Sequence, residues 1–295
     1  MSVLQLLLPA FAAGLILTGM LSYLGLHVVE RGVIFVDLSL AQIAALGATI
    51  AALFHHDIHS RQAYLFSLGF TFLGAAVFAF SRVHRRTRIP QEAIIGIAYA
   101  VAAAAAILAM SKVSGETEHL KEMLVGNILA VSWSELAKTA VLYVAIGAVH
   151  WILRKKFLLI SLDEPEAERQ GVSIRFWDFL FYVTFGFVVT SSVPVAGVLL
   201  VFSYLIVPAV SAMLFSTRIG PRLAIGWGIG ATVTAIGVYL SYAFDLPTGA
   251  TIVTSLGASL VLLAAVRAFV PSRKPERARD QASGRAGGGE PLAGA

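Results

Sequence analysis

The sequence has few charged residues and no cysteine, and both absences narrow the classes of protein to which it can belong. Only 13% of its 295 residues are charged, whereas 58% are hydrophobic and the mean hydropathy is +0.81. A soluble domain usually has roughly 25% charged residues. Without cysteine the chain can form no disulfide, no cysteine-ligated zinc site and no iron–sulfur cluster. The composition predicts an integral membrane protein.

The chain also lacks a phosphate-binding loop. The Walker A pattern requires a lysine directly after a glycine, and none of the six lysines is in that position. Any ATP-driven work would therefore need a separate subunit. The net charge of +5 does not lead us to expect a nucleic-acid partner, because in a membrane protein the placement of basic residues matters more than their sum.

Repeated apolar runs of about 20 residues predict an all-α fold, a polytopic bundle of eight or nine transmembrane helices. The expected spans are 3–26, 33–54, 63–81, 91–111, 135–153, 177–193, 196–215, 222–242 and 248–269. The first run has no basic start, so we expect it to remain in the protein as a span. The sixth and seventh runs meet at SSVPVAG, where Ser191, Ser192 and Pro194 predict either a tight turn or a break within one longer hairpin.

Basic residues gather on one side of this arrangement. If the N-terminus is outside, 18 of the 22 lysines and arginines lie inside, and only Arg61, Lys112, Lys121 and Lys138 lie outside. Cytoplasmic loops collect lysine and arginine in this way.

We divide the chain into a transmembrane domain at 1–270 and a disordered cytoplasmic tail at 271–295, because the tail is polar and lacks apolar periodicity.

One short acidic segment, ISLDEPEAERQGVSI at 160–174, has the pattern of a capped cytoplasmic helix. Ser161 or Asp163 can cap its start, Pro165 suits the first turn, the glutamates favour the positive end of the helix, and Gly171 is a typical stop. The pattern predicts an exposed helix of about two turns. It can be a solvated loop helix or a docking helix for a soluble partner.

Five stretches, in this order, resemble the membrane permease subunits of ABC metal importers for zinc and manganese. They are QEAIIGI (91–97), LVGNILAVSWSEL (124–136), DEPEAERQGV (163–172), VAGVLLVFSYLIVPAVSA (195–212) and YAFDLPTGATIV (242–253). The resemblance covers about residues 1–270. It implies a bacterial inner-membrane protein that moves a divalent metal as its substrate and binds no cofactor of its own.

The resemblance also implies three partners and a coupling helix. The partners are an ABC ATPase subunit, an extracytoplasmic metal-binding protein and a second copy of the permease in a homodimer. The acidic segment would be the helix that docks on the ATPase. Its residues are Asp163, Glu164, Pro165, Glu166, Ala167, Glu168 and Gly171.

The second span offers candidates for the cation path. Ionisable groups inside spans are costly and usually face a cavity, and this span contains Asp37, with Gln42 and Ser39 on nearly one helix face. In the family an aspartate is commonly followed four residues later by a histidine. Here Leu38 and Gln42 occupy those positions, and Asp37 points about 140° away from Gln42 on an ideal helix. Asp37 either lines the path or pairs with an interior arginine or hydroxyl and orders the bundle.

The segment HHDIH at 55–59 is the second candidate for metal binding. His55, His56, Asp57 and His59 lie on a predicted external loop, and imidazole and carboxylate suit Zn²⁺ and, less selectively, Mn²⁺. They are either a low-affinity capture site at the entrance or ordinary polar loop residues. These histidines favour zinc slightly over manganese.

Three other functions are left to compare. An importer of another solute, such as a metal chelate, would have the same architecture. An ATP-independent carrier would show two related halves, and no internal repeat is visible. An intramembrane enzyme would need a nucleophile and a base or a metal triad within the spans, where we expect histidines only at the edges and no paired carboxylates.

Overall fold

The computed structural model describes residues 3–56, 60–81, 90–112 and 128–269, and every regular element among them is helical. The predicted tail at 271–295 lies outside the described residues, as do Asp57 and His59 of the HHDIH segment. The all-α class predicted from the apolar runs is confirmed.

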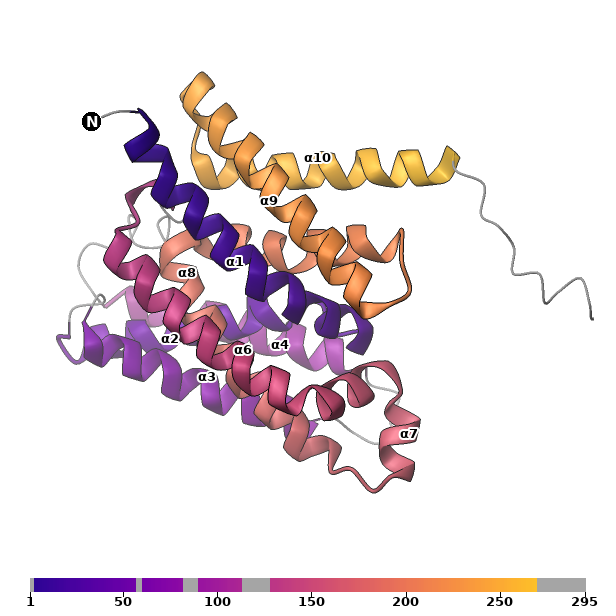
Figure 1. The fold of residues 1–295 in the computed structure, drawn as a ribbon. Coiled ribbons are helices and arrows are strands. Elements are labelled where there is room, and N and C mark those ends of the chain that lie inside the picture. The colour runs from indigo at the N-terminus through magenta and orange to yellow at the C-terminus, as the bar shows by residue number, and fades with distance from the viewer. Residues whose placement is uncertain (1–2, 57–59, 82–89, 113–127, 270–295) are drawn as a thin grey trace, which may run out of the picture.

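Nine α-helices and one short 3-10 helix follow one another along the described chain (Figure 1). They are α1 (Val3–Arg31), α2 (Val36–Leu53), α3 (Arg61–Ser81), α4 (Gln91–Met110), η1 (Ile128–Ala130), α6 (Trp133–Leu162), α7 (Glu164–Arg169), α8 (Ile174–Met213), α9 (Ile219–Phe244) and α10 (Thr248–Phe269). All the α-helices except α7 are long and apolar enough to cross a membrane.

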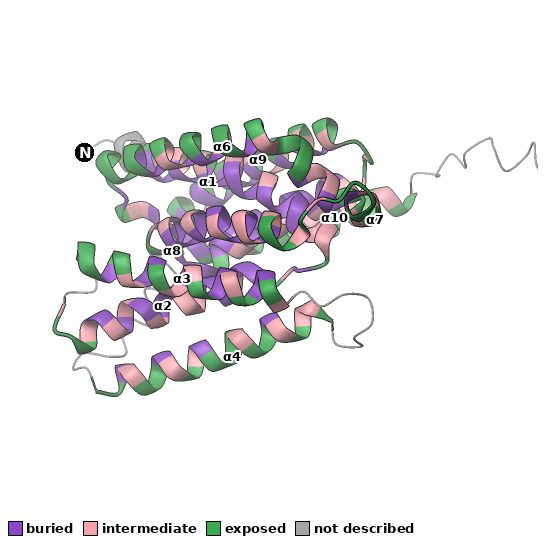
Figure 2. Cartoon of the chain, turned by 90° about the horizontal axis from the view of Figure 1, so that it is seen from below, coloured by how far each residue is buried: buried purple, intermediate pink, exposed green. Residues whose placement is uncertain are grey.

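Helix α8 is the centre of the bundle. It packs against α1, α2, α3, α9 and α10, and Figure 2 shows its buried residues between the layer of α1, α6 and α9 and the layer of α2 and α3. Helix α4 lies outermost and packs mainly on α2. Because α8 contacts both layers, a change in its position would alter its packing against most of the other spans.

Helix α8 contains two helical limbs joined by a kink at Gly197, where φ is 76° and ψ is 159°. A straight helix of its 40 residues would be about 60 Å long, twice the hydrocarbon thickness of roughly 30 Å. The break falls within SSVPVAG as predicted, but at its last residue rather than at Ser191, Ser192 or Pro194. Those three residues remain helical, because α-helices in membranes tolerate proline.

Both ends of α8 lie at the same end of the bundle. Near its start, Asp178 pairs with Arg31 in the last turn of α1. Just after its end, the Ser216 carbonyl accepts a hydrogen bond from Arg222, which in turn pairs with Glu30 of α1. The chain therefore reverses at Gly197, so that among the described residues the two limbs of α8 and the seven other long helices give nine segments that could cross a membrane.

Several helices extend beyond their predicted spans at the end of the bundle that the basic residues predict to be cytoplasmic. Helix α1 runs to Arg31 instead of 26, and α6 runs to Leu162 instead of 153. No proline or glycine interrupts the segment 154–162, and its basic side chains are exposed, so the helix continues into the water. Ser161 consequently lies in the last turn of α6 and is buried, so the prediction that it might cap the next helix is wrong.

We predict that Gly197→Ala destabilises the protein, because a φ of 76° with a ψ of 159° is a conformation that is accessible almost only to glycine. The expected loss is about 1–3 kcal/mol, measured as a lower melting temperature of the protein purified in detergent. Gly228→Ala in α9 is the matched control, since an added Cβ meets nothing within 4 Å there. Equal melting temperatures for the two variants would contradict the prediction.

Candidate functional site

Helix α7 forms because its sequence supplies both of its caps. The Asp163 side chain accepts a hydrogen bond of 3.0 Å from the Glu166 amide, and Pro165 lies in the first turn. At the other end Gly171 has a φ of 70°. The Gly171 amide donates to the Glu168 carbonyl and the Val172 amide donates to the Ala167 carbonyl, each at 3.0 Å. This is the Schellman arrangement, so the predicted short capped helix is present.

One face of α7 is buried, and acidic side chains lie on its exposed surface. Ala167 is fully buried, which fixes one face of α7 against the bundle, whereas Asp163 and Glu168 are exposed. Glu166 pairs with Arg169 at 2.7 Å and accepts a hydrogen bond from Gln170 at 2.9 Å. Exposed polar side chains therefore lie on the outer face of α7, and Figure 1 shows this helix between the end of α6 and the start of α8.

A buried cluster of charged and polar groups lies beside α7. The Arg31 guanidinium donates to Asp178 Oδ1 at 2.6 Å, and the two side chains are 1% and 0% exposed. Arg31 Nε donates to Ser161 Oγ at 2.8 Å, and the guanidinium carbon lies 4.1 Å from the centre of the Phe181 ring. One arginine therefore joins the ends of α1 and α6 to the start of α8.

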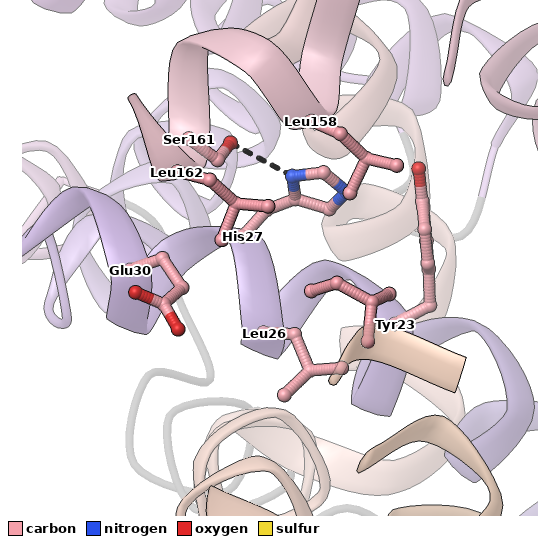
Figure 3. Close-up of a pocket in the computed structure, with 8 residues that line it drawn as sticks. Tyr23, Leu26, His27, Glu30, Leu158, Ser161 and Leu162 are labelled. Atoms are coloured by element: carbon pink, nitrogen blue, oxygen red, sulfur yellow. Dashed lines mark hydrogen bonds between the residues drawn. The ribbon is translucent and has the colours of Figure 1, made fainter. Parts of the chain in front are cut away.

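Two histidines extend this cluster into the bundle. His27 Nδ1 is hydrogen-bonded to Ser161 Oγ at 2.8 Å, as Figure 3 shows. His150 Nε2 is hydrogen-bonded to the Thr184 hydroxyl at 2.8 Å, and its Nδ1 lies 3.3 Å from the Tyr23 hydroxyl. Both histidines are almost completely buried. These histidines, which lie next to the predicted span ends at 26 and 153, are therefore buried inside the bundle and not exposed at its edge.

The sequence contains a signal for this cluster that span prediction does not use. Asp178 lies between aromatic residues in FWDFLFY, where a carboxylate needs a partner because burial of an unpaired charge is costly. Arg31 is the corresponding cation. Asp178 and Arg31 are 147 residues apart in the chain, and no local pattern connects them.

The three residues predicted for the cation path all lie on α2 but differ in burial. Asp37 lies in its first turn and is 2% exposed, and Ser39 is fully buried. Among the described residues, Asp37 Oδ1 and Ser39 Oγ have no hydrogen-bond partner. Gln42 is half-buried and so reaches a different environment. Asp37 and Ser39 are therefore buried more completely than Gln42.

A second carboxylate stands at the cytoplasmic end of α2. Glu92, in the first turn of α4, accepts a hydrogen bond of 3.0 Å from the Phe35 amide, just before α2 begins. Phe35 lies two residues before Asp37. The buried guanidinium of Arg31 pairs with Asp178. Asp37 and Glu92 are therefore acidic neighbours at the inner end of α2.

The HHDIH segment is only partly described. His55 is exposed and has a φ of 62°, whereas His56 is half-buried and its ring centre lies 6.4 Å from that of Phe66. In the part of the chain that the structure describes, no three His, Asp or Glu side chains meet in a geometry that holds a metal.

The fold and this arrangement match known transport proteins. The profile of the ABC 3 transport family matches residues 3–268. The manganese transport system membrane protein MntC of Listeria innocua is 31% identical over 196 residues, which is 64% of this chain and 69% of that protein. The chelated iron transport system membrane protein YfeC of Yersinia pestis is 27% identical and is aligned over 68% of this chain and 70% of its own.

Two solved structures share the fold. PsaBC from Streptococcus pneumoniae in complex with Fab has a TM-score of 0.73 at 23% identity, covering 88% of this chain and 92% of that chain. A putative metal-chelate type ABC transporter in an inward-facing conformation has a TM-score of 0.68 at 21% identity, covering 88% and 85%. The chain is a multi-pass protein of the bacterial inner membrane and belongs to the ABC 3 transport family.

Proposed function

We propose that this chain is the permease subunit of an ATP-driven importer that moves a divalent transition-metal cation into the cytoplasm. The observation that carries the proposal is α7, a capped acidic helix held between α6 and α8 at the cytoplasmic end. The chain has no phosphate-binding loop, so ATP would be hydrolysed by a separate ABC subunit on which α7 docks. The chain itself would then be a transport subunit and not an enzyme.

Helix α2 supports a path for a cation. Asp37 and Glu92 would provide negative charge at its inner end, and Gln42 would provide a neutral oxygen further out. Gln42, Phe35 and Leu199 retain exposed surface in the single chain. A second permease copy would cover this surface, and the cation would then pass between the two copies. An external metal-binding protein would deliver it to the outer ends of the helices.

The names of the relatives direct the choice of metal to test. Relatives are named for manganese transport and for iron transport, and the histidines of HHDIH suit zinc. Uptake of Mn²⁺, Fe²⁺ and Zn²⁺, each supplied singly to cells that express the complete transporter, would identify the substrate. The family match over residues 3–268 favours ATP-driven import over an ATP-independent carrier.

Import of a metal chelate is the second candidate. It is favoured by the relative named for chelated iron and by an amide, Gln42, where the family commonly has a histidine. A neutral amide binds a bare cation weakly. Supplying the metal as a free ion and as a preformed chelate, at equal free-ion activity, separates the two candidates. Faster uptake from the chelate would favour the second.

We predict that Asp37→Ala abolishes metal uptake while the permease still assembles with its ATPase. The carboxylate is buried and one of its oxygens has no partner among the described residues, so its cost indicates a role in transport. Radiometal uptake and co-purification of the ATPase measure the two effects. Asp245→Asn, which alters an exposed carboxylate in an external turn, should transport normally. Wild-type uptake by Asp37→Ala would make the carboxylate structural.

We predict that replacing His55, His56 and His59 together with alanine raises the metal concentration needed for half-maximal uptake. The maximal rate should fall little, because a capture site would affect only the local supply of ions. Concentration dependence of radiometal uptake measures both quantities. An unchanged half-maximal concentration would show that these histidines are ordinary loop residues.

We predict that reversing Glu164 and Glu168 to lysine separates the permease from its ATPase. The change would oppose the helix dipole in the first turn of α7 and remove the complementarity to a basic groove. The variant should reach the membrane at normal levels but lose co-purification with the ATPase and all uptake. Lys155→Glu reverses an exposed charge on α6 and should retain both.

Gly171 provides a graded second test of the same helix. Gly171→Val should lose coupling, because a β-branched residue opposes the positive φ by roughly 1–2 kcal/mol. Gly171→Asn should keep most of it, because asparagine tolerates that conformation. If the glutamate variant and Gly171→Val both keep the ATPase and full stimulated hydrolysis, α7 is a solvated loop helix.

A further inference from the structure

The last turn of α1 holds the cytoplasmic ends of three other helices. Arg31 contacts Asp178 of α8 and Ser161 of α6. The preceding residue, Glu30, pairs with Arg222 of α9. Arg222 Nε also donates to the Ser216 carbonyl at 2.7 Å, just after the second limb of α8. Arg31 therefore contacts the first limb of α8 directly, and Glu30 is linked to the end of the second limb through Arg222 of α9.

Helix α7 is joined to this cluster at both of its ends. Ser161 precedes the N-cap residue Asp163 by two positions, and only Ser173 and three other residues lie between the end of α7 at Arg169 and the start of α8. Asp178 is in the second turn of α8. The two helices that lead into and out of α7 are thus hydrogen-bonded to a single guanidinium.

The burial of Arg31 makes this connection stiff. Its ion pair with Asp178 is closed to water, and removing one partner of such a pair leaves a buried charge without compensation. The guanidinium also lies against the Phe181 ring at 4.1 Å, and Ser161 is further fixed by His27. Small displacements would break several of these contacts at once, so the group has few alternative arrangements.

We propose that Arg31 and Asp178 are positioning residues that join the ends of α1, α6 and α8 into one rigid body. A movement of α7 is then passed to α1 and α8 and is not absorbed in the short connections on either side of it. This inference rests on the proposed docking of α7 on an ATPase. The two residues act through α7 and the spans, and they touch neither the ATPase nor the metal.

The test compares metal moved per ATP hydrolysed in proteoliposomes that contain the complete transporter, with Mn²⁺ as the probe. Arg31→Gln and Asp178→Asn should keep co-purification of the ATPase, because the outer face of α7 is unchanged. We expect both to lower the ratio of Mn²⁺ moved to ATP hydrolysed at least tenfold. Arg31→Lys and Asp178→Glu keep the charges and should restore part of the ratio.

A double variant addresses the risk that the single variants misfold. Arg31→Gln combined with Asp178→Asn removes both charges and leaves a neutral pair that can still form hydrogen bonds, so no buried charge remains. If the double variant is stable and transports with the wild-type ratio, the ion pair only stabilises the fold and the proposal is overturned. A low ratio in a stable double variant supports it.

Spin labels provide a readout that does not depend on the substrate. The chain has no cysteine, so Lys155→Cys on α6 and Gln170→Cys after α7 can be labelled selectively, and both positions are exposed. With the ion pair intact, the distance between the labels should stay constant when the complex binds ATP. In the double variant the distance should change. A distance that is constant in both, or that changes in both, contradicts the proposal.

The outcomes separate this inference from the proposed function. Loss of ATPase binding in the α7 variants, together with retained binding in the Arg31 and Asp178 variants, supports both. If the α7 variants keep the ATPase, the proposed docking fails whatever the ion-pair variants do. If the Arg31 and Asp178 variants themselves lose the ATPase, these residues shape the docking surface and the inference as stated is wrong.

Discussion

A guanidinium at the edge of a membrane can be held inside a protein only if other groups replace the water that it loses. Arg31 meets this condition with the carboxylate of Asp178, the hydroxyl of Ser161 and the face of Phe181. These partners come from α6 and α8, so the solvation of one side chain requires three helices to meet at one point. The position of α7 follows, because the chain enters it from α6 and leaves it into α8.

Farther from the Arg31 cluster, the helices are joined by hydrogen bonds between neutral side chains. Hydroxyl pairs link the helices there, including Thr71 with Thr190, Tyr143 with Ser192 and Tyr204 with Thr234. Neutral contacts of this kind contribute about 0.6 kcal/mol on average between membrane helices. Breaking a buried ion pair costs several times more. The buried ion pair therefore joins the ends of α1 and α8 more strongly than each hydroxyl pair joins its helices.

The sequence predicted those features that depend on residues close together in the chain, namely the helical spans and the caps of α7. Apolar runs predicted the spans, and the pattern of Asp163, Pro165 and Gly171 predicted a helix whose caps are those observed. Contacts between distant residues were not accessible in this way. Ser161 reads equally well as a cap or as an interior hydroxyl until His27 and Arg31 are placed beside it.

The reversal in α8 also shows what the sequence alone could not predict, namely which residue of the break makes the turn. The segment SSVPVAG was correctly identified as a break, because it joins serine, proline and glycine between two apolar runs. Proline attracts attention in such a segment, yet Pro194 remains helical and Gly197 makes the turn. Only the backbone angles distinguish them, since a φ of 76° with a ψ of 159° is open to glycine and closed to its neighbours.

The contacts of Arg31 at the end of α1 also affect the proposed cation path, because α2, which contains Asp37, follows α1 directly in the chain. Arg31 ends α1, Gly32 has a φ of 66°, and the Gly32 and Val33 amides donate back to the Val29 and Val28 carbonyls in a tight cap. Helix α2 begins at Val36, and Glu92 holds the Phe35 amide at that point.

Only five residues therefore separate Arg31, which fixes the ends of α6 and α8, from Asp37, the buried carboxylate of α2. With so short and tightly capped a connection, a displacement of the end of α1 must shift the first turn of α2 as well. In the proposed importer, motion received at α7 would reach Asp37 through Arg31 without a long chain of intermediate contacts. The rigid cytoplasmic end and the acidic inner end of the path would then respond as one unit.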